Sequence, residues 1–481
     1  MKRWLSKLSV FFLIVFLIVS GNPGLSKAKA GAKEETIIIF NNDRVPAEVI
    51  KLFEGKFKEA KKTILPEVGM IKLEDSKIID EIKEKFKGSI VYTGKETKLF
   101  MPKQELLDEY PMAPFKHKVI ANSIASLEAE PSSIPSVNNA YLYQILGWDI
   151  KKITEDGESF KKQTGNHKVK IAIIDSGIDF NHPDLKNNII SNGKSFVPNI
   201  EDTQDRMGHG TMTAGTIAAN GLMLGVGPNL GLIPYKVMDN WVDGAESTWV
   251  IEAIIQAAND GVDVINLSLG TYKSLKNPED RVIVEGYKRA VRYAETKGVA
   301  VVASTGNDNY DLSNPLLLAE LRGFANDKQV HLPGGGISSL ISVTATDVKD
   351  QLSSYSNYGN VTIAAPGGDY GEEWESKGIL DIFSLNLTTY PTNLPQPYLS
   401  QILGLPEGYA LTVGTSLAAP KVAGTIGLLI AENKKFKKAP LNINKIEMIL
   451  RKSAVDLGEP GKDKYFGYGL INANKALDLI K

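Results

Sequence analysis

Five short apolar runs, spread over the C-terminal two thirds of the chain, constrain its fold most strongly. Apolar runs of this length, with helical patterns between them, are typical of strands buried on both faces of a parallel sheet. The alternation predicts an α/β fold, with a doubly wound, mostly parallel sheet and helices on both faces. The expected strands are Val169–Ile174, Val262–Leu267, Val299–Ala303, Leu340–Val343 and Val361–Ala364, and the clearest helices are Thr248–Ala258 and Val282–Thr296.

A smaller unit precedes this sheet. Its pattern mixes strand-like and helix-like pieces and offers few residues to bury, so we expect a small α+β unit that is marginally stable alone. The expected strands are Thr36–Phe40, Met70–Leu73 and Ser89–Tyr92, and the expected helices are Pro46–Phe57 and Lys77–Phe86.

The N-terminus has the features of an export signal. Basic residues precede the apolar run Leu8–Val19, and Ala28-Lys29-Ala30 offers the small-x-small pattern of a cleavage site. The run is shorter than the roughly 20 residues that a membrane-spanning helix needs. We therefore predict a signal peptide at 1–30 and a secreted protein without a stable membrane anchor, with a retained anchor as the alternative.

The remaining chain divides into three zones. Residues 31–110 hold the small α+β unit, and residues 111–137 form a proline-containing linker of the kind that proteases cleave. Residues 138–481 form one large domain. The net charge of −1 gives no reason to expect nucleic acid as a partner, and the absence of cysteine excludes disulfides and thiolate chemistry. We expect a monomer.

Two residues suited to proton transfer follow apolar segments. Asp175 comes directly after an apolar strand, and a carboxylate there points toward the crevice where parallel sheets bind ligands. His209 lies between two glycines, just before a helix expected at Thr213–Ala219. Taken alone, each has an ordinary alternative: the Asp as a helix cap or turn residue, and the His as an incidental side chain.

Two further residues suit acyl transfer. Ser416 stands at the start of an expected helix, where oriented N–H groups favour negative charge. Asn307 follows the strand Val299–Ala303, and its amide donates a hydrogen bond without changing charge. A helix-capping serine and a turn asparagine are the structural alternatives.

In combination, these segments resemble the subtilisin-like serine proteases over roughly Ile171–Ala476. They occur in the family's order Asp, His, Asn, Ser. The matching segments are Asp175-Ser176-Gly177 with His182-Pro183-Asp184-Leu185, Gly208-His209-Gly210-Thr211, Asn266-Leu267-Ser268-Leu269-Gly270, Gly306-Asn307 and Gly414-Thr415-Ser416.

The resemblance implies a serine endopeptidase with a Ser-His-Asp triad. Ser416 is then the nucleophile, His209 the general base, and Asp175 the group that orients and stabilises the imidazolium. Asn307 and the backbone N–H of Ser416 form the oxyanion hole. This chemistry requires no cofactor, and its partner is a peptide substrate.

The same resemblance assigns substrate-binding segments and a role for the small unit. The family's prosegment acts as a folding aid and inhibitor, which residues 31–110 match in size and pattern, so we expect cleavage in the linker. The expected substrate-binding residues are Ser268, Leu269 and Gly270, which pair with the substrate backbone, and Ser304, Thr305 and Gly306, which line the first specificity pocket.

Asp184 matches a calcium ligand of the family, but the segment Asn220–Leu224 is shorter and more apolar than the usual calcium loop. Calcium needs about six to eight oxygen ligands. We therefore expect no metal at this site and a structural role for Asp184, while structural calcium elsewhere stays open.

His331 lies near the position where related enzymes build the bottom of the first pocket. It is either a pocket residue that hydrogen-bonds an acidic substrate side chain or an ordinary surface-loop histidine. The linker contains Glu128 and Glu130, so self-cleavage after a glutamate is one possibility. The bond after Glu128 is the better candidate, because Pro131 follows Glu130.

Within the family, the segment Gly147–Lys151 and its neighbours look like the leader peptidases of lantibiotic biosynthesis. Two long segments, Tyr310–Val330 and Gly368–Tyr409, border the expected cleft and favour narrow specificity. The alternatives are a broad-specificity secreted nutritional protease and a catalytically dead binding protein on the same fold. A missing triad residue would have been the signature of the second alternative, and all three are present.

Overall fold

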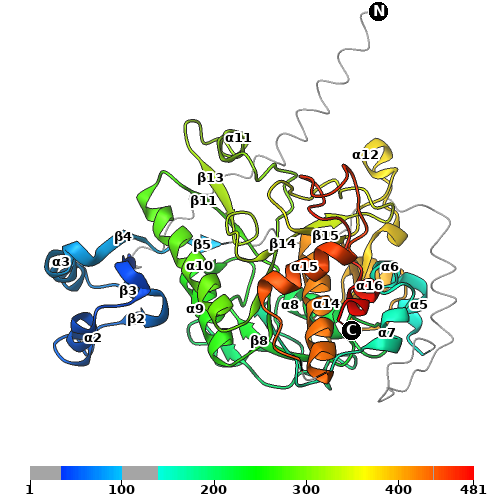
Figure 1. The fold of residues 1–481 in the computed structure, drawn as a ribbon, viewed down its shortest axis with the longest axis horizontal. Helices are drawn as coiled ribbons and strands as arrows, with labels where there is room; N and C mark the ends of the chain where they lie inside the picture. Colours follow the sequence, from blue (N-terminus) through cyan, green and yellow to red (C-terminus); the bar gives the residue numbers. More distant parts are fainter. Residues whose placement is uncertain (1–33, 100–138, 437, 481) are drawn as a thin grey trace, which may run out of the picture.

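The computed structural model describes residues 34–99, 139–436 and 438–480 (Figure 1). The predicted signal peptide and the linker lie outside these ranges, as do both glutamates proposed as cleavage sites. No helix within the described ranges is long and apolar enough to cross a membrane.

The large domain is built on a seven-stranded sheet with the order β15-β14-β12-β10-β6-β8-β7. Every strand pair in it is parallel, and all five apolar runs form strands of this sheet. The predicted doubly wound α/β fold is therefore confirmed. The strands are β6 (Lys170–Asp175), β7 (Lys194–Ser195), β8 (Gly231–Lys236), β10 (Val264–Leu267), β12 (Ala300–Ser304), β14 (Ile341–Thr346) and β15 (Ile363–Pro366).

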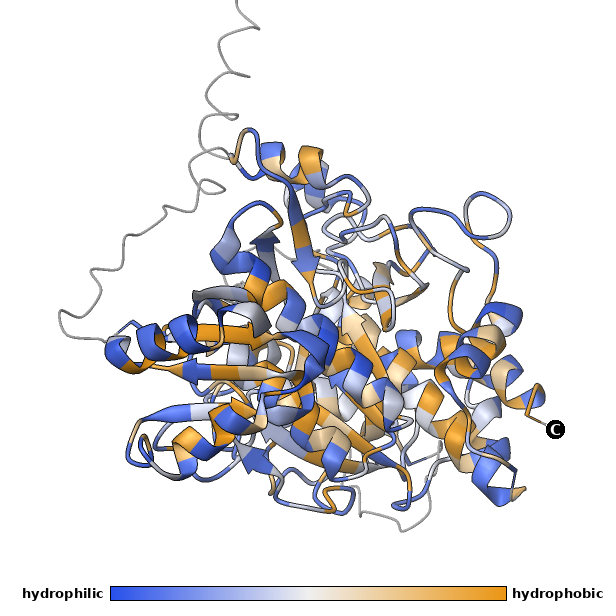
Figure 2. Ribbon diagram, turned by 60° about the vertical axis from the view of Figure 1, so that its left-hand side comes forward, coloured by the Kyte–Doolittle hydropathy of each residue, from blue (hydrophilic) through white to orange (hydrophobic). Residues whose placement is uncertain are grey.

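Helices cover both faces of this sheet, which explains why its central strands are buried on both sides. On β6, Ile171 and Ile173 join the core beneath α8 and α14, while Ala172 and Ile174 join the core beneath α9 and α10. Hydrophobic residues accordingly gather where the strands meet these helices (Figure 2). The four helices are α8 (His209–Ala218), α9 (Ser247–Asn259), α10 (Pro278–Thr296) and α14 (Thr415–Lys435).

The sequence pattern missed strand β8. Pro234 lies in the middle of this strand and lacks the N–H that a ladder hydrogen bond needs, which disguises a run that is otherwise buried. On the side of β8 that faces β7, Leu232 pairs with Ile189 and Tyr235 pairs with Lys194. Pro234 lies between these two paired positions.

The N-terminal unit, residues 34–99, contains an antiparallel sheet with the order β2-β3-β1-β4 and two helices on one face. The three predicted strands and both predicted helices are present, and β2 was missed. The elements are β1 (Thr36–Phe40), α2 (Ala47–Glu54), β2 (Lys62–Leu65), β3 (Met70–Leu73), α3 (Ser76–Lys85), β4 (Ile90–Lys95) and β5 (Lys98–Leu99).

The other face of this small sheet packs against the large domain. Ile37, Ile39 and Met70 belong to the same hydrophobic core as α9 and α10, which lie between the N-terminal unit and the central sheet (Figure 1). Arg289 of α10 reaches across and donates to the carbonyl oxygens of Phe40 (2.7 Å) and Val68 (3.1 Å). The small unit thus gains from its partner the burial that it cannot supply alone.

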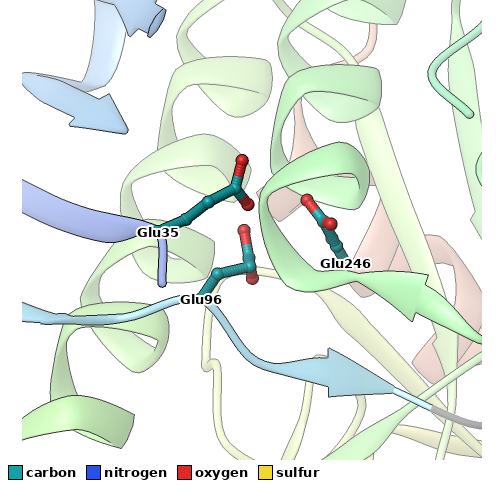
Figure 3. Close-up of side chains that lie close together, drawn as sticks. All are labelled: Glu35, Glu96 and Glu246. Atoms are coloured by element: carbon teal, nitrogen blue, oxygen red, sulfur yellow. The ribbon is translucent and has the colours of Figure 1, made fainter. Parts of the chain in front are cut away.

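A charged cluster lies at the edge of this interface. The carboxylates of Glu35 and Glu96 from the N-terminal unit and of Glu246 before α9 face one another (Figure 3). Lys72 lies among them, with its Nζ atom 2.6 Å from Glu246, 3.1 Å from Glu35 and 3.7 Å from Glu96. Burial opposes the charge of Lys72, but the hydrogen bond to Glu246 and the other carboxylates outweigh it and raise its pKa. The ammonium group therefore fills the space that a cation would need.

The remaining elements surround the large domain. They are α5 (Tyr141–Leu146), α6 (Trp148–Thr154), α7 (Glu158–Lys162), β9 (Ala245–Glu246), β11 (Thr271–Ser274), α11 (Pro315–Leu321), β13 (Gln329–Leu332), α12 (Trp374–Lys377), β16 (Asn386–Thr389), α13 (Tyr398–Ile402), β17 (Tyr409–Thr412), α15 (Ile443–Ser453) and α16 (Ala473–Asp478). Strands β11 and β13 pair antiparallel.

Gly94 lets β4 lie directly on α10. A Cβ atom at this position would lie 2.6 Å from Cγ1 of Val282 and 2.7 Å from the carbonyl oxygen of Glu279. We expect Gly94→Val to weaken the packing of the N-terminal unit by about 1–3 kcal/mol, because overpacking forces the two surfaces apart. Hydrogen exchange of β4 and α10 in the intact chain measures the effect.

Gly88→Val is the matched control, because no atom lies within 4 Å of a Cβ built there. It should leave the exchange of both elements unchanged. Equal protection in the two variants would contradict the proposed contact.

Candidate active site

The four residues singled out for chemistry gather at one cleft of about 620 Å³. Asp175 is the last residue of β6, and Asn307 lies just beyond the end of β12. His209 begins α8 and Ser416 is the second residue of α14. The expected helix after His209 therefore starts four residues earlier than predicted, at the histidine itself. His209, Asn307 and Ser416 line the cleft, and Asp175 is buried behind His209.

Asp175 fixes the orientation of the imidazole. Its carboxylate is fully buried, and each of its two oxygens lies 2.9 Å from Nδ1 of His209. The backbone N–H of Ser176 also donates to this carboxylate (2.7 Å). Because a carboxylate accepts, Nδ1 carries a proton in this pair, which leaves Nε2 of His209 to accept one at the cleft.

A second buried carboxylate, Asp205, holds the start of α8 in place. One of its oxygens accepts hydrogen bonds from the hydroxyl of Ser176 and the backbone N–H groups of Met207 and Gly208, each 2.9 Å long. The other accepts from the N–H (2.9 Å) and the hydroxyl (2.7 Å) of Thr211. Sequence reasoning missed Asp205; an Asp a few residues before a helix is a capping signal that could have found it.

Two hydrogen bonds connect Ser416 with Ser268, which follows β10. The hydroxyl of Ser268 donates to the carbonyl oxygen of Ser416 (2.8 Å), and the hydroxyl of Ser416 donates to the carbonyl oxygen of Ser268 (3.2 Å). The hydroxyl proton of Ser416 must therefore be redirected before it can pass to His209.

Asn307 is oriented by Thr415. Its Oδ1 atom accepts from the backbone N–H (3.0 Å) and the hydroxyl (2.7 Å) of Thr415, so its amide N–H groups point the other way. A Cβ built on Gly414 would lie 3.5 Å from Nδ2 of Asn307 and 3.7 Å from the backbone nitrogen of Ser416. Two N–H donors thus approach the same small space, which the glycine leaves open.

The predicted substrate-binding residues fall into two groups. Ser268, Leu269, Gly270, Ser304 and Gly306 line the cleft as expected. Thr305 does not: it is fully buried, and its hydroxyl donates to the carbonyl oxygens of Val343 and Asn357, both at 3.1 Å. The prediction that Thr305 lines the pocket is wrong, because its side chain points from the end of β12 into the wall of the cleft.

His331 lines the cleft from strand β13 and is only 3% exposed. The surface-loop interpretation is therefore wrong, and the pairing of β13 with β11 is the reason that the side chain is buried. Burial, with a smaller contribution from Arg322, lowers the pKa of His331 to about 3. The imidazole is neutral at ordinary pH.

Asp184 has the structural contacts that the sequence suggested. Its two carboxylate oxygens accept the backbone N–H groups of Leu222 (3.2 Å) and Met223 (2.8 Å). The short apolar segment thus folds onto this carboxylate.

The N-terminal unit reaches the cleft. Strand β5 pairs antiparallel with β9, and Lys98 is among the residues that line the cleft. The carbonyl oxygen of Thr97 accepts from the N–H (3.0 Å) and the hydroxyl (2.9 Å) of Ser247. Both long segments reach the cleft as well, through Arg322 of the first and Tyr370 of the second.

Comparison with known proteins agrees with this geometry. The model of the subtilase family, Peptidase_S8, matches residues 166–469, which include all four chemistry-bearing side chains. The chain belongs to the subtilase family. It is a serine endopeptidase of the subtilisin type, and subtilases act on peptide substrates.

Among named subtilases, this chain is similar to leader peptidases. The epidermin leader peptide-processing serine protease EpiP of Staphylococcus epidermidis is 31% identical over 69% of this chain and 73% of that protein. The nisin leader peptide-processing serine protease NisP of Lactococcus lactis is 30% identical over 65% of this chain and 48% of that protein. The crystal structure of a lanthipeptide protease matches with a TM-score of 0.65 and 36% identity, covering 73% of this chain and all of that one.

We expect Asp205→Asn to destabilise the subtilase by about 1–3 kcal/mol. An amide cannot accept on both sides, so a buried N–H at the start of α8 loses its partner. Hydrolysis of a peptide should fall as well, because His209 begins the same helix. Denaturant unfolding and peptide hydrolysis measure the two effects.

The control is Asp202→Asn, which changes an exposed carboxylate paired with Arg206. It should alter the free energy of unfolding by less than about 0.5 kcal/mol. If both variants unfolded at the same denaturant concentration, the role of Asp205 would have to be abandoned.

Proposed function

We propose that this subtilase is a secreted, self-processing maturation protease that removes leader peptides from lantibiotic-type precursors. The observation that carries the catalytic part is the buried pair of Asp175 with His209, placed in one cleft with Ser416 and two converging N–H donors. The similarity to EpiP and NisP supports the class of substrate.

The proposed chemistry uses four side chains and no cofactor. Nε2 of His209 takes the hydroxyl proton as Ser416 attacks the scissile carbonyl, and later returns that proton to the leaving amine. Asp175 stabilises the imidazolium that forms between these steps. Nδ2 of Asn307 and the backbone N–H of Ser416 stabilise the oxyanion, and Gly414 leaves room for it.

The segment Ser268–Gly270 is proposed to bind the substrate backbone. It follows β10 directly, lines the cleft and belongs to no strand of the described structure, so an incoming peptide can pair with it as an added strand. Its hydrogen bonds with Ser416 couple its position to that of the nucleophile.

Residues 31–110 are proposed to act as an inhibitory prosegment. The described part shares a hydrophobic core with α9 and α10, and its last strand enters the cleft at Lys98. Because Lys98 lines the cleft, the unit is proposed to obstruct substrate there, and cleavage in the linker 111–137 would allow it to leave. The predicted signal at 1–30 supports secretion.

The proposal is tested by the intact mass of the exported protein. Wild-type protein should lack the N-terminal unit, while Ser416→Ala should keep it, because the variant has no nucleophile to cut the linker. Ser191→Ala, which changes a serine outside the cleft, is the control and should be processed like wild type.

Each other outcome has a defined meaning. Equal processing of wild type and Ser416→Ala would show that another protease cuts the linker, and an uncut wild type would contradict self-activation. Cleavage of unrelated denatured proteins at many sites would favour the broad nutritional protease instead of a leader peptidase.

A further inference from the structure

Gly270, Gly306 and the imidazole of His331 border part of the cleft that contains Ser416. A Cβ atom on Gly270 would clash with Nε2 of His331, and one on Gly306 would lie 3.0 Å from the same atom. The ring of His331 therefore lies between the two segments expected to flank the first specificity pocket. A substrate side chain that enters between these glycines meets Nε2.

His331 supplies a hydrogen-bonding group to this pocket but no charge. Its pKa of about 3 leaves the ring neutral, and Nδ1 is buried without a hydrogen-bond partner among the described residues. A neutral imidazole can donate one hydrogen bond. Any charge that selects a substrate must therefore come from another residue.

Arg322 supplies a positive charge at this cleft. The cations that line the cleft are Arg322 and Lys98, and Lys98 belongs to the N-terminal unit. Arg322 follows α11, in the long segment between Asn307 and β13. Its guanidinium lies 4.1 Å from the centre of the Tyr272 ring, and that ring lies 4.9 Å from the His331 ring. The three side chains thus form one group at the cleft.

Arg322 is half-buried and lacks a salt bridge in the described structure. It donates to the side chain of Gln329, a neutral group. The arginine salt bridges of the described residues involve Arg206, Arg289 and Arg292. Burial lowers the pKa of Arg322, so the charge is held at a cost in free energy.

The acidic residue that lines the cleft, Asp308, favours the charged form of Arg322 but makes its hydrogen bond to another side chain. The carboxylate of Asp308 accepts the hydroxyl of Tyr272 (2.5 Å) and is exposed to solvent. Tyr272 in turn accepts from the amide of Asn357 (2.8 Å), which fixes the ring that Arg322 covers. Arg322 is thus half-buried at the cleft, whereas the carboxylate of Asp308 is exposed and hydrogen-bonded to Tyr272.

We propose that Arg322 and His331 together select an acidic side chain, Glu or Asp, at the residue whose carbonyl Ser416 attacks. A guanidinium offers paired N–H donors that match a carboxylate, and the neutral imidazole adds a further donor. A basic side chain would be repelled by Arg322, and an apolar one would leave the cation unpaired. The inference rests on the proposed function, because it names the substrate class of that same site.

The test compares four peptides that differ only at this residue, which is Glu, Gln, Leu or Lys. The processed wild-type enzyme should hydrolyse the Glu peptide about 100-fold faster than the Gln peptide in kcat/KM, because only the charge differs. In Arg322→Gln this ratio should fall to within a few-fold of one. Arg322→Lys keeps the charge without the paired donors and should retain an intermediate preference.

Arg451→Gln is the matched control, because Arg451 also packs over a tyrosine, with its guanidinium 5.6 Å from the Tyr468 ring, but lies outside the cleft. It should keep the wild-type ratio. Thermal unfolding of each variant shows that it is folded, and the ratio of two peptides on one enzyme is independent of the active fraction.

Failure of this inference differs from failure of the proposed function. Faster hydrolysis of the Leu or Lys peptide, or an unchanged ratio in Arg322→Gln, would overturn the acidic preference while leaving a Ser416-dependent protease. If wild type hydrolysed none of the peptides and failed to process itself, the proposed catalytic function would be wrong instead.

Discussion

The hydrogen bond between the buried carboxylate of Asp175 and Nδ1 of His209 is the interaction on which the rest of the site depends. It sets which nitrogen carries the proton and so leaves the other to act on a hydroxyl. A buried carboxylate is tolerated there because the backbone N–H of Ser176 also donates to it. The parallel sheet and α8 bring the two residues together, although they lie 34 positions apart in the chain.

The supporting residues show how the fold preserves this geometry. Asp205 accepts a hydrogen bond from the hydroxyl of Ser176, the residue after Asp175. It also accepts from the N–H of Thr211 in the first turn of α8, the helix that begins at His209. The carboxylate and the imidazole are therefore tied to one hydrogen-bonded unit. On the other side of the cleft, Thr415 orients the amide of Asn307, so the donors and the nucleophile are linked through adjacent residues of α14.

The N-terminal unit depends on the large domain for its packing. One face of its sheet is covered by its own helices, and the other packs against α9 and α10. Lys72 of the N-terminal unit also pairs with Glu246 of the large domain (2.6 Å), so an ion pair spans the interface. Apolar packing and an ion pair therefore both join the N-terminal unit to the large domain.

Much of the fold could be predicted from the sequence because burial on both faces leaves a simple signal. Strands β6, β10, β12, β14 and β15 each contain a short apolar run, whereas β8 was hidden by Pro234. The order of the short motifs located Asp175, His209, Asn307 and Ser416 in advance.

The walls of the cleft were harder to predict than its chemistry. Thr305 and the residues beside it share one short segment, and only the backbone conformation decides which of them faces the cleft. His331 is buried through the pairing of β13 with β11, and Arg322 reaches Tyr272 across a long loop. No local pattern in the sequence specifies these non-local contacts.

The most direct measurement of the central claim is covalent labelling with diisopropyl fluorophosphate, in which the activated serine hydroxyl attacks phosphorus and fluoride leaves. The account predicts one label per chain, located by peptide mass spectrometry on Ser416, and labelling slower by about 1000-fold or more in His209→Ala. Labelling of a different serine, or an equal rate in His209→Ala, would contradict the proposal that the Asp175–His209 pair activates Ser416.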